Sequence, residues 1–266
     1  MATARLSGVN LHYEVSGNGP AVTLAHGFAD SMAFWDGQVD VLSEQFTVVR
    51  YDQRGHGDSD DRTEGMSIGA LASDLVKLLD CLQIEKTAII GHSMGGRVAF
   101  QFSLAFPERT WALVPVDAEC SPPEREYAKL VHDLGIVLKT VGLEGLLRTF
   151  EAAGEVPVRA MVDPVWGNAY RRRFLSNRPG ALLDALRAIV QMPHLCEDLS
   201  TLTTPTLVVV GEHDGPVRQS VVRYAPLIRN CAVVVVPNVQ HCPNVDAPEF
   251  FNQILVEFLL QVSMKA

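Results

Sequence analysis

A serine between two glycines separates an apolar run from a helix-like segment, and this junction constrains the fold more than any other stretch. Residues 87–90 are apolar or β-branched without polar alternation, which is typical of a buried parallel strand. Residues 97–106 suit a helix that ends before Pro107. Between them, Gly-His-Ser-Met-Gly at 91–95 fits the G-x-S-x-G motif, in which a sharp strand-to-helix turn exposes the serine hydroxyl at the edge of a sheet. The stretch therefore predicts a parallel α/β unit with Ser93 at its end.

The flanking glycines are expected to have a steric role. Gly91 and Gly95 lie where side chains would collide if a strand and a helix packed closely, and Gly96 gives the first helical turn room to approach the sheet. We therefore predict backbone contacts at these positions that leave no space for a Cβ atom.

Length and charge limit the classes of function. The chain has 266 residues, 47% of them hydrophobic, which is enough for one large α/β domain with an insertion. Twenty-two Lys and Arg against 31 Asp and Glu give a net charge of −9, and the absence of a basic tail argues against a nucleic-acid partner. No apolar stretch reaches the roughly 18 residues that span a bilayer, and no long apolar signal segment opens the chain. We expect a cytoplasmic protein without membrane attachment.

The cysteines indicate neither a disulfide framework nor a zinc site, because they are odd in number and lack C-x-x-C spacing. We expect reduced, mostly buried thiols at all five positions: Cys81, Cys120, Cys196, Cys231 and Cys242.

The remaining chain alternates between strand and helix patterns around one helical block. Strands are predicted at 9–15, 21–25, 46–51, 111–116, 206–210 and 232–236, and helices at 68–82, 219–229 and 248–260. From about 124 to 199 the pattern is helical, with breaks at glycines and prolines. This order predicts a mostly parallel sheet, built from residues 1–120 and 200–266, that carries a helical insertion at 121–199.

Ser93 needs a base and a carboxylate to become a nucleophile, and both should follow later strands because reactive groups gather at the carboxyl ends of parallel strands. Asp214 follows the strand at 206–210, and His241 follows the strand at 232–236. Asp117 is the alternative acid because it also ends a strand, and His213 is the nearest rival base. Asp246 is interpreted as a cap of the final helix. His26, His56 and His92 are expected to hydrogen-bond loops.

An oxyanion formed at Ser93 would need two backbone donors, for which we assign the N–H groups of Met94 and Phe28. Arg97 could contact an anionic substrate or take part in a structural ion pair. The chain has no H-E-x-x-H or comparable ligand spacing, so we expect no metal and no cofactor. Four large side chains are candidates for the substrate pocket, although an aromatic residue in a cap helix more often belongs to the core: Trp35, Tyr127, Met161 and Trp166.

Taken together, these segments resemble the α/β-hydrolase fold family over nearly the full length of the chain. The matching stretches are 26–28, 52–59, 91–96, 211–214 and His241, in that order. The resemblance implies an eight-stranded, mainly parallel sheet flanked by helices, with the segment 121–199 acting as a helical cap over Ser93. A serine nucleophile argues against the haloalkane dehalogenases and epoxide hydrolases, which resemble this chain but use aspartate.

The resemblance implies a serine hydrolase of the esterase or lactonase type, which cleaves a small to medium carboxylic ester or lactone through an acyl-enzyme. Carbon–carbon bond hydrolysis, or a related lyase reaction with the same triad, is the alternative chemistry. A ligand receptor built on the hydrolase scaffold is an alternative from another class. We expect a small-molecule substrate as partner, and a monomer or homodimer.

Overall fold

The computed structural model describes residues 1–122 and 125–264. Eight strands form one sheet in the order β1-β2-β4-β3-β5-β6-β7-β8. The strands β1 and β2 are antiparallel to their neighbours, and the other six are parallel. Their bounds are β1 (Ala2–Leu6), β2 (Val9–Ser16), β3 (Ala21–Ala25), β4 (Thr47–Tyr51), β5 (Thr87–His92), β6 (Thr110–Val116), β7 (Thr206–Gly211) and β8 (Cys231–Val236). The predicted mostly parallel, eight-stranded α/β sheet is thus confirmed.

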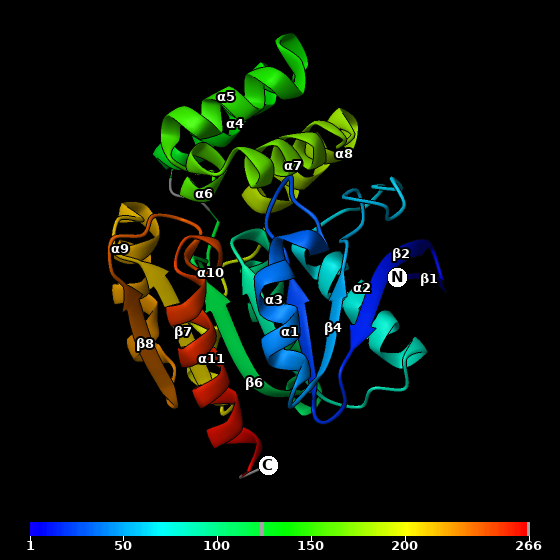
Figure 1. Cartoon of the computed structure of the whole chain (residues 1–266), viewed down its shortest axis with the longest axis vertical. Helices are drawn as coiled ribbons and strands as arrows, with labels where there is room; N and C mark the ends of the chain where they lie inside the picture. The colour runs from blue at the N-terminus through cyan, green and yellow to red at the C-terminus, as the bar shows by residue number, and fades with distance from the viewer. Residues whose placement is uncertain (123–124, 265–266) are drawn as a thin grey trace.

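Helices cover both faces of the sheet and form two separate cores. One face packs against α2 (Ile68–Cys81), α3 (Met94–Ala105) and α9 (Gly215–Tyr224). The other packs against α1 (Asp36–Ser43) and α11 (Pro248–Ser263), which lie in front of the sheet in Figure 1. In β5, Ile89 belongs to the first core, and Ala88 and Ile90 belong to the second. Both faces of this strand are therefore buried, which explains its unbroken apolar run.

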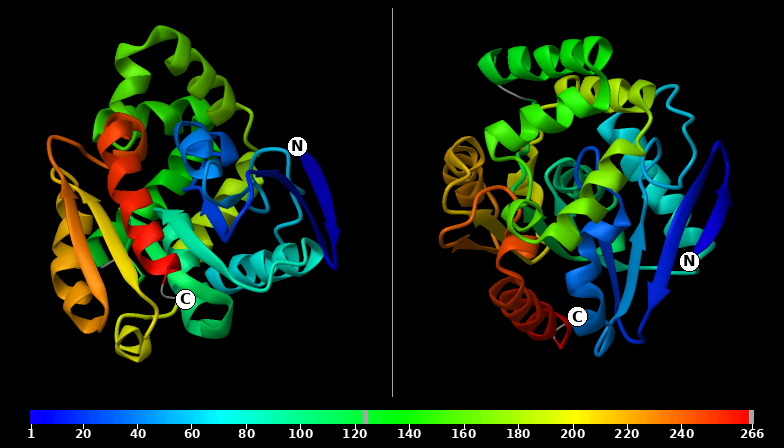
Figure 2. Two further views of the ribbon diagram at one scale, coloured as in Figure 1. Left: turned by 60° about the horizontal axis from the view of Figure 1, so that its bottom comes forward. Right: turned by 45° about the horizontal axis from the view of Figure 1, so that its top comes forward.

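A second group of helices separates β6 from β7 and is called the insertion below. It contains α4 (Arg125–Thr140), α5 (Gly142–Ala153), α6 (Val158–Val162), α7 (Pro164–Leu175) and α8 (Pro179–Val190). Figures 1 and 2 show these helices as a layer over one end of the sheet. Their own apolar core includes Leu138, Leu146, Leu147, Phe174 and Leu182. Most large apolar residues of the insertion are therefore used for its internal packing.

Contrary to the prediction from the sequence, Asp246 does not cap the final helix but contacts the insertion. Both carboxylate oxygens of Asp246 accept hydrogen bonds from the insertion, from Val158 N and Arg159 N, each at 3.0 Å. The final helix, α11, has Ala247 at its N-cap position and receives no side-chain cap there. Asp246 thus caps the start of α6 instead, because the short helix α10 (Pro243–Asp246) directs it toward the insertion.

The cysteines also depart from the prediction of five reduced thiols. Cys120 and Cys196 form a disulfide across 76 residues of sequence, and Cys120 is buried. They lie on the two segments that connect the insertion to the sheet, so the fold brings them together although their spacing gives no sign of it. Cys81, Cys231 and Cys242 are free. Among the described residues, no helix has both the length and the apolar composition that a bilayer span requires.

Candidate active site

Ser93 lies at the turn between β5 and α3 with a strained backbone. Its φ of 51° and ψ of −113° form a combination that residues with a side chain rarely adopt. The turn is held by the neighbouring strand and by the helix, since Ser93 N donates to Val116 O at 2.9 Å and Arg97 N donates to Ser93 O at 3.1 Å. The strand-to-helix elbow predicted from the sequence is therefore present.

The glycines beside the turn are required by close backbone packing. A Cβ atom on Gly91 would overlap the carbonyl oxygen of Gly95, and one on Gly95 would overlap the carbonyl oxygen of Ala25. Both obstacles are main-chain atoms, so a side-chain rotation could not relieve them. The predicted steric role of the two glycines is confirmed.

His241 and Asp214 are brought together by loops after adjacent strands, β8 and β7. His241 Nδ1 lies 2.6 Å from Asp214 Oδ2. This hydrogen bond fixes the orientation of the imidazole and leaves its other nitrogen, Nε2, available to a different partner. Asp214 is buried, which alone would raise its pKa, but the charge and hydrogen bond of His241 hold that pKa below its ordinary value. Asp214 is thus an ionised partner of the imidazole. The rival His213 is exposed.

Asp117, the alternative acid, lies behind Asp214. Its Oδ1 accepts a hydrogen bond from Gly211 N at 2.9 Å. Burial raises the pKa of Asp117 well above its ordinary value, and the Asp214 carboxylate adds to this effect. A neutral Asp117 can donate its proton to Asp214, and this hydrogen bond helps to lower the pKa of Asp214. The two carboxyl groups therefore form a pair in which Asp214 carries the charge.

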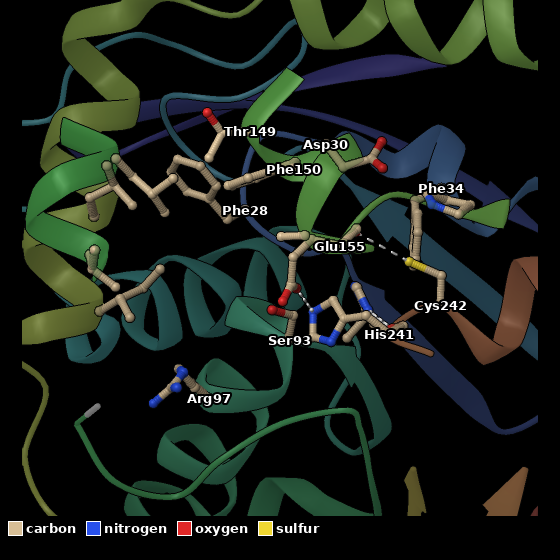
Figure 3. Close-up of a pocket in the computed structure, with 18 of the residues that line it drawn as sticks. Phe28, Asp30, Phe34, Ser93, Arg97, Thr149, Phe150, Glu155, His241 and Cys242 are labelled. Atoms are coloured by element: carbon tan, nitrogen blue, oxygen red, sulfur yellow. Dashed lines mark hydrogen bonds and ion pairs between the residues drawn. The ribbon is translucent and has the colours of Figure 1, made fainter. Parts of the chain in front are cut away.

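The free nitrogen of His241 faces a carboxylate from the helical insertion. Glu155 lies between α5 and α6, and its Oε2 is 3.8 Å from His241 Nε2. Figure 3 shows this carboxylate at the imidazole, beside Ser93. Burial lowers the pKa of His241, but Glu155, Asp214 and Asp117 outweigh burial and raise it to about 10. Sequence reasoning missed Glu155, and no pattern could have shown it, since it is one of many acidic residues in a helical block.

Three further histidines hold the loops around the site, as expected. His26 Nε2 accepts from Gln53 N at 3.0 Å, and His56 Nδ1 lies 3.1 Å from Arg54 O. His92 Nε2 lies 2.7 Å from the carbonyl oxygen of His241. Burial lowers the pKa of His26 to about 4 and that of His56 to about 3, so both rings are neutral at physiological pH. They position backbone rather than exchange protons.

Ser93 and His241 open into one cavity beneath the insertion (Figure 3). Apart from these two residues, its lining is mainly apolar and includes Phe28, Phe34, Val131, Leu134, Phe150, Tyr170, Leu186 and Ile189. Of the residues predicted around the oxyanion, Phe28 lines the cavity, and Met94 is fully buried at the start of α3. The backbone of Gly27 approaches Ser93, since a Cβ on this glycine would lie 3.4 Å from Ser93 Cβ.

The predicted pocket residues need correction. Trp35 is fully buried in the sheet domain against Phe251, because the turn at Met32–Trp35 directs Phe34, not Trp35, to the cavity. Met161 is mainly exposed on α6. Trp166 stacks on Tyr170 with ring centroids 5.5 Å apart and does not line the cavity. Tyr127 lies outside the residues whose side chains the structure describes.

Arg97 reaches the cavity, but its charge is already compensated. It forms an ion pair with Glu119 and donates to Ser121 O, and all but 7% of its side chain is buried. Of the two roles that the sequence left open for Arg97, contact with an anionic substrate or a structural ion pair, this arrangement corresponds to the ion pair.

Two side-chain groups among the described residues bring possible metal ligands together. One consists of Asp117, Asp214 and His241, whose ligand atoms lie within 4.8 Å of one another, and their hydrogen bonds already engage them. In the other, His12, Asp52 and Asp58, the Asp52 oxygens accept from Met32 N and Asp58 N. In both groups, hydrogen bonds already engage carboxylate oxygens that a metal ion would need.

Comparison with known proteins places this geometry in a family. A family model described as the alpha/beta hydrolase fold matches residues 20–248. A stretch of 106 residues is 41% identical to an uncharacterized protein of Mycobacterium tuberculosis, but it covers 40% of this chain and 31% of that protein. The chain thus spans less than a third of that relative's length.

Other relatives match from end to end. The chain is 30% identical to a putative carbamate hydrolase of Variovorax paradoxus, with 95% of this chain and 97% of the relative covered. It is 28% identical to a putative 2-succinyl-6-hydroxy-2,4-cyclohexadiene-1-carboxylate synthase of Bacillus subtilis, with 95% and 96% covered. The structure of a thermophilic esterase from Thermogutta terrifontis is similar, with a TM-score of 0.89, 26% identity, and 98% and 99% covered. The chain belongs to the α/β-hydrolase fold family.

Proposed function

We propose that this hydrolase cleaves a small to medium carboxylic ester or lactone through an acyl-enzyme. The observation that carries the proposal is the hydrogen bond of 2.6 Å between Asp214 and His241, an imidazole that lines the same cavity as the strained Ser93. The esterase from Thermogutta terrifontis, a solved structure with a TM-score of 0.89, supports the same class of substrate.

In the proposed mechanism, Ser93 Oγ attacks the substrate carbonyl while His241 Nε2 accepts the hydroxyl proton. Asp214 orients the imidazole and stabilises its charged form. The N–H groups of Phe28 and Met94 hold the oxyanion. His241 then gives the proton to the leaving group, and it finally activates the water that releases the acyl group from Ser93. The insertion acts as a cap that excludes bulk water from the cavity.

Covalent labelling combined with turnover tests this proposal. We expect a fluorophosphonate to modify the protein once, at Ser93, and p-nitrophenyl esters from acetate to dodecanoate to be hydrolysed over many turnovers. The ester chain length with the highest kcat/KM would give the size of the acyl site. Release of a single equivalent of p-nitrophenol, or a label at another residue, would count against the proposed ester hydrolase.

The pH dependence of turnover follows from the charges around His241. The base must be neutral to accept a proton, and the carboxylates of Glu155 and Asp214 favour its protonated form. We therefore expect kcat/KM to fall as pH decreases, with a midpoint above the ordinary histidine pKa of about 6.5. In Glu155→Gln the neutral amide no longer stabilises the imidazolium, so the midpoint should move to lower pH. Ester hydrolysis measured from about pH 5 to about pH 11 checks both results.

Glu151→Gln is the matched control for this pH profile. Glu151 is also in the insertion, but its carboxylate lies 3.9 Å from Arg171 and does not line the cavity. Its substitution removes the same charge and should leave the midpoint in place. A wild-type midpoint at or below pH 6.5, or one that Glu155→Gln does not move, would contradict the role given to the carboxylate beside Nε2.

Carbon–carbon bond cleavage or a related lyase reaction is the second candidate. The observation that favours it is the 28% identity, over nearly the full length, to the putative synthase of Bacillus subtilis. The same residues would act on a different electrophile. Rapid turnover of esters with none of a vinylogous diketone would reject this alternative, and the opposite pattern would replace the ester proposal.

A further inference from the structure

The position of Glu155 is fixed by the loop that joins α5 to α6. Gly154 ends α5 with a φ of 73°, and a Cβ there would overlap the side chain of Gln240. Cys242 Sγ lies 3.9 Å from the carbonyl oxygen of Glu155. The insertion loop is thus packed against the segment that carries His241. This packing directs the Glu155 carboxylate into the cavity, where 38% of its side chain remains exposed and open to a ligand.

The charged side chains that line the cavity differ in whether a residue of opposite charge lies beside them. Asp30 also lines it and is largely buried, with Arg173 Nε at 3.9 Å. Burial raises the pKa of Asp30 to about 6, so this carboxyl group is mostly ionised at neutral pH. Arg97 lies across Ser93 from Asp30 in Figure 3. It forms an ion pair with Glu119. The carboxylate of Glu155 has no Lys or Arg partner among the ion pairs of the described residues, and its partner there is His241 Nε2 at 3.8 Å. When His241 is neutral, as a base must be, a cationic ligand can meet the charge of Glu155.

Aromatic rings line the same cavity as this carboxylate. They come from Phe28, Phe34 and Phe150, and also from Tyr170, although the guanidinium of Arg173 already lies 5.9 Å from the centroid of the Tyr170 ring. The rings of Phe28 and Phe150 lie with centroids 6.0 Å apart. Aromatic rings combined with a carboxylate favour a positively charged, weakly hydrated group, because the rings attract a cation electrostatically and need no hydrogen bond from it. A neutral apolar group of the same size gains the apolar contacts alone, and an anion is repelled.

We propose that Glu155 and the aromatic lining bind a quaternary or alkylated ammonium group on the alcohol part of the substrate. The inference rests on the proposed ester hydrolysis in one respect: the assignment of the bound group to the alcohol part of the substrate. Glu155 lies at His241 Nε2, the atom that gives its proton to the leaving alcohol, so a group bound there belongs to the alcohol and not to the acyl chain. The preferred substrate class is therefore esters of amino alcohols.

Binding can be measured without any reaction. Choline and neohexyl alcohol have nearly the same shape, but a carbon atom in the second replaces the charged nitrogen of the first. At a pH above the midpoint of kcat/KM, where His241 is neutral, we expect the wild type to bind choline about tenfold more tightly than neohexyl alcohol in an NMR titration, and Glu155→Gln to reduce this ratio to near one. Glu151→Gln should keep the wild-type ratio. Equal binding of the two alcohols to the wild type, or a ratio that Glu155→Gln leaves unchanged, would overturn the inference.

Hydrolysis of acetylcholine and neohexyl acetate provides a second test. Glu155→Gln also changes the pKa of His241, but this effect is common to both esters and cancels in the ratio of their kcat/KM values. We expect that ratio to favour acetylcholine about tenfold in the wild type and in Glu151→Gln, and to be lost in Glu155→Gln. If neither ester nor the p-nitrophenyl series is hydrolysed, ester hydrolysis fails as the function, while the choline titration still decides whether the cation site exists.

Discussion

Replacement of Ser93 by alanine is expected to lower kcat for the best p-nitrophenyl ester by about 10,000-fold or more. The substitution removes the atom that forms the acyl-enzyme, and the cavity offers no second nucleophile in the position fixed by the elbow. Alanine keeps the Cβ atom and adds no bulk, so the strained turn at φ 51° should survive. Substrate binding should change little, because most of the cavity lining is apolar and remains in place.

Ser103→Ala is the matched control for this experiment. Ser103 is buried in the same helix, α3, and its hydroxyl has no hydrogen-bond partner among the described residues. We expect it to retain nearly the wild-type kcat and thermal stability. If Ser93→Ala kept more than about a hundredth of the wild-type rate while its fold was intact, hydrolysis would proceed without a covalent serine intermediate.

The sequence was sufficient for the features that depend on local backbone geometry. The apolar run before Ser93 and the glycines beside it predict both the buried strand β5 and the tight elbow, because only small residues allow such close packing. The order of strands and helices likewise predicts the parallel sheet. The strand β1 was not predicted from the pattern, since Ala4 is its only buried residue and its alternation is weak.

Features that depend on long-range contacts could not be predicted. Phe34 and Trp35 are neighbours on one helical turn, and no local pattern shows which of them faces the cavity. The disulfide between Cys120 and Cys196 depends on how the insertion returns to the sheet. Glu155 contacts His241 only because the insertion folds over the end of the sheet. Many of the residues that line the cavity therefore come from the part of the chain with the least informative pattern.

Asp214 and Asp117 can be distinguished by the same conservative substitution at each position. Asp214→Asn replaces a charged acceptor by an amide that cannot stabilise a protonated His241, and its N–H₂ group can turn the imidazole to the wrong tautomer. We expect kcat to decrease by about 10,000-fold in this variant, as measured with p-nitrophenyl esters at the wild-type pH optimum.

Asp117→Asn should have a much smaller effect, because burial and the neighbouring Asp214 carboxylate raise the pKa of Asp117 well above its ordinary value and so favour its neutral form. An asparagine amide can still donate to Asp214 through its nitrogen and accept from Gly211 N through its oxygen, so it reproduces both hydrogen bonds of the protonated acid. We expect kcat within about tenfold of the wild type. A large loss in Asp117→Asn together with a small one in Asp214→Asn would instead assign the catalytic charge to Asp117, at the end of β6, and the imidazole would have to change partner during turnover.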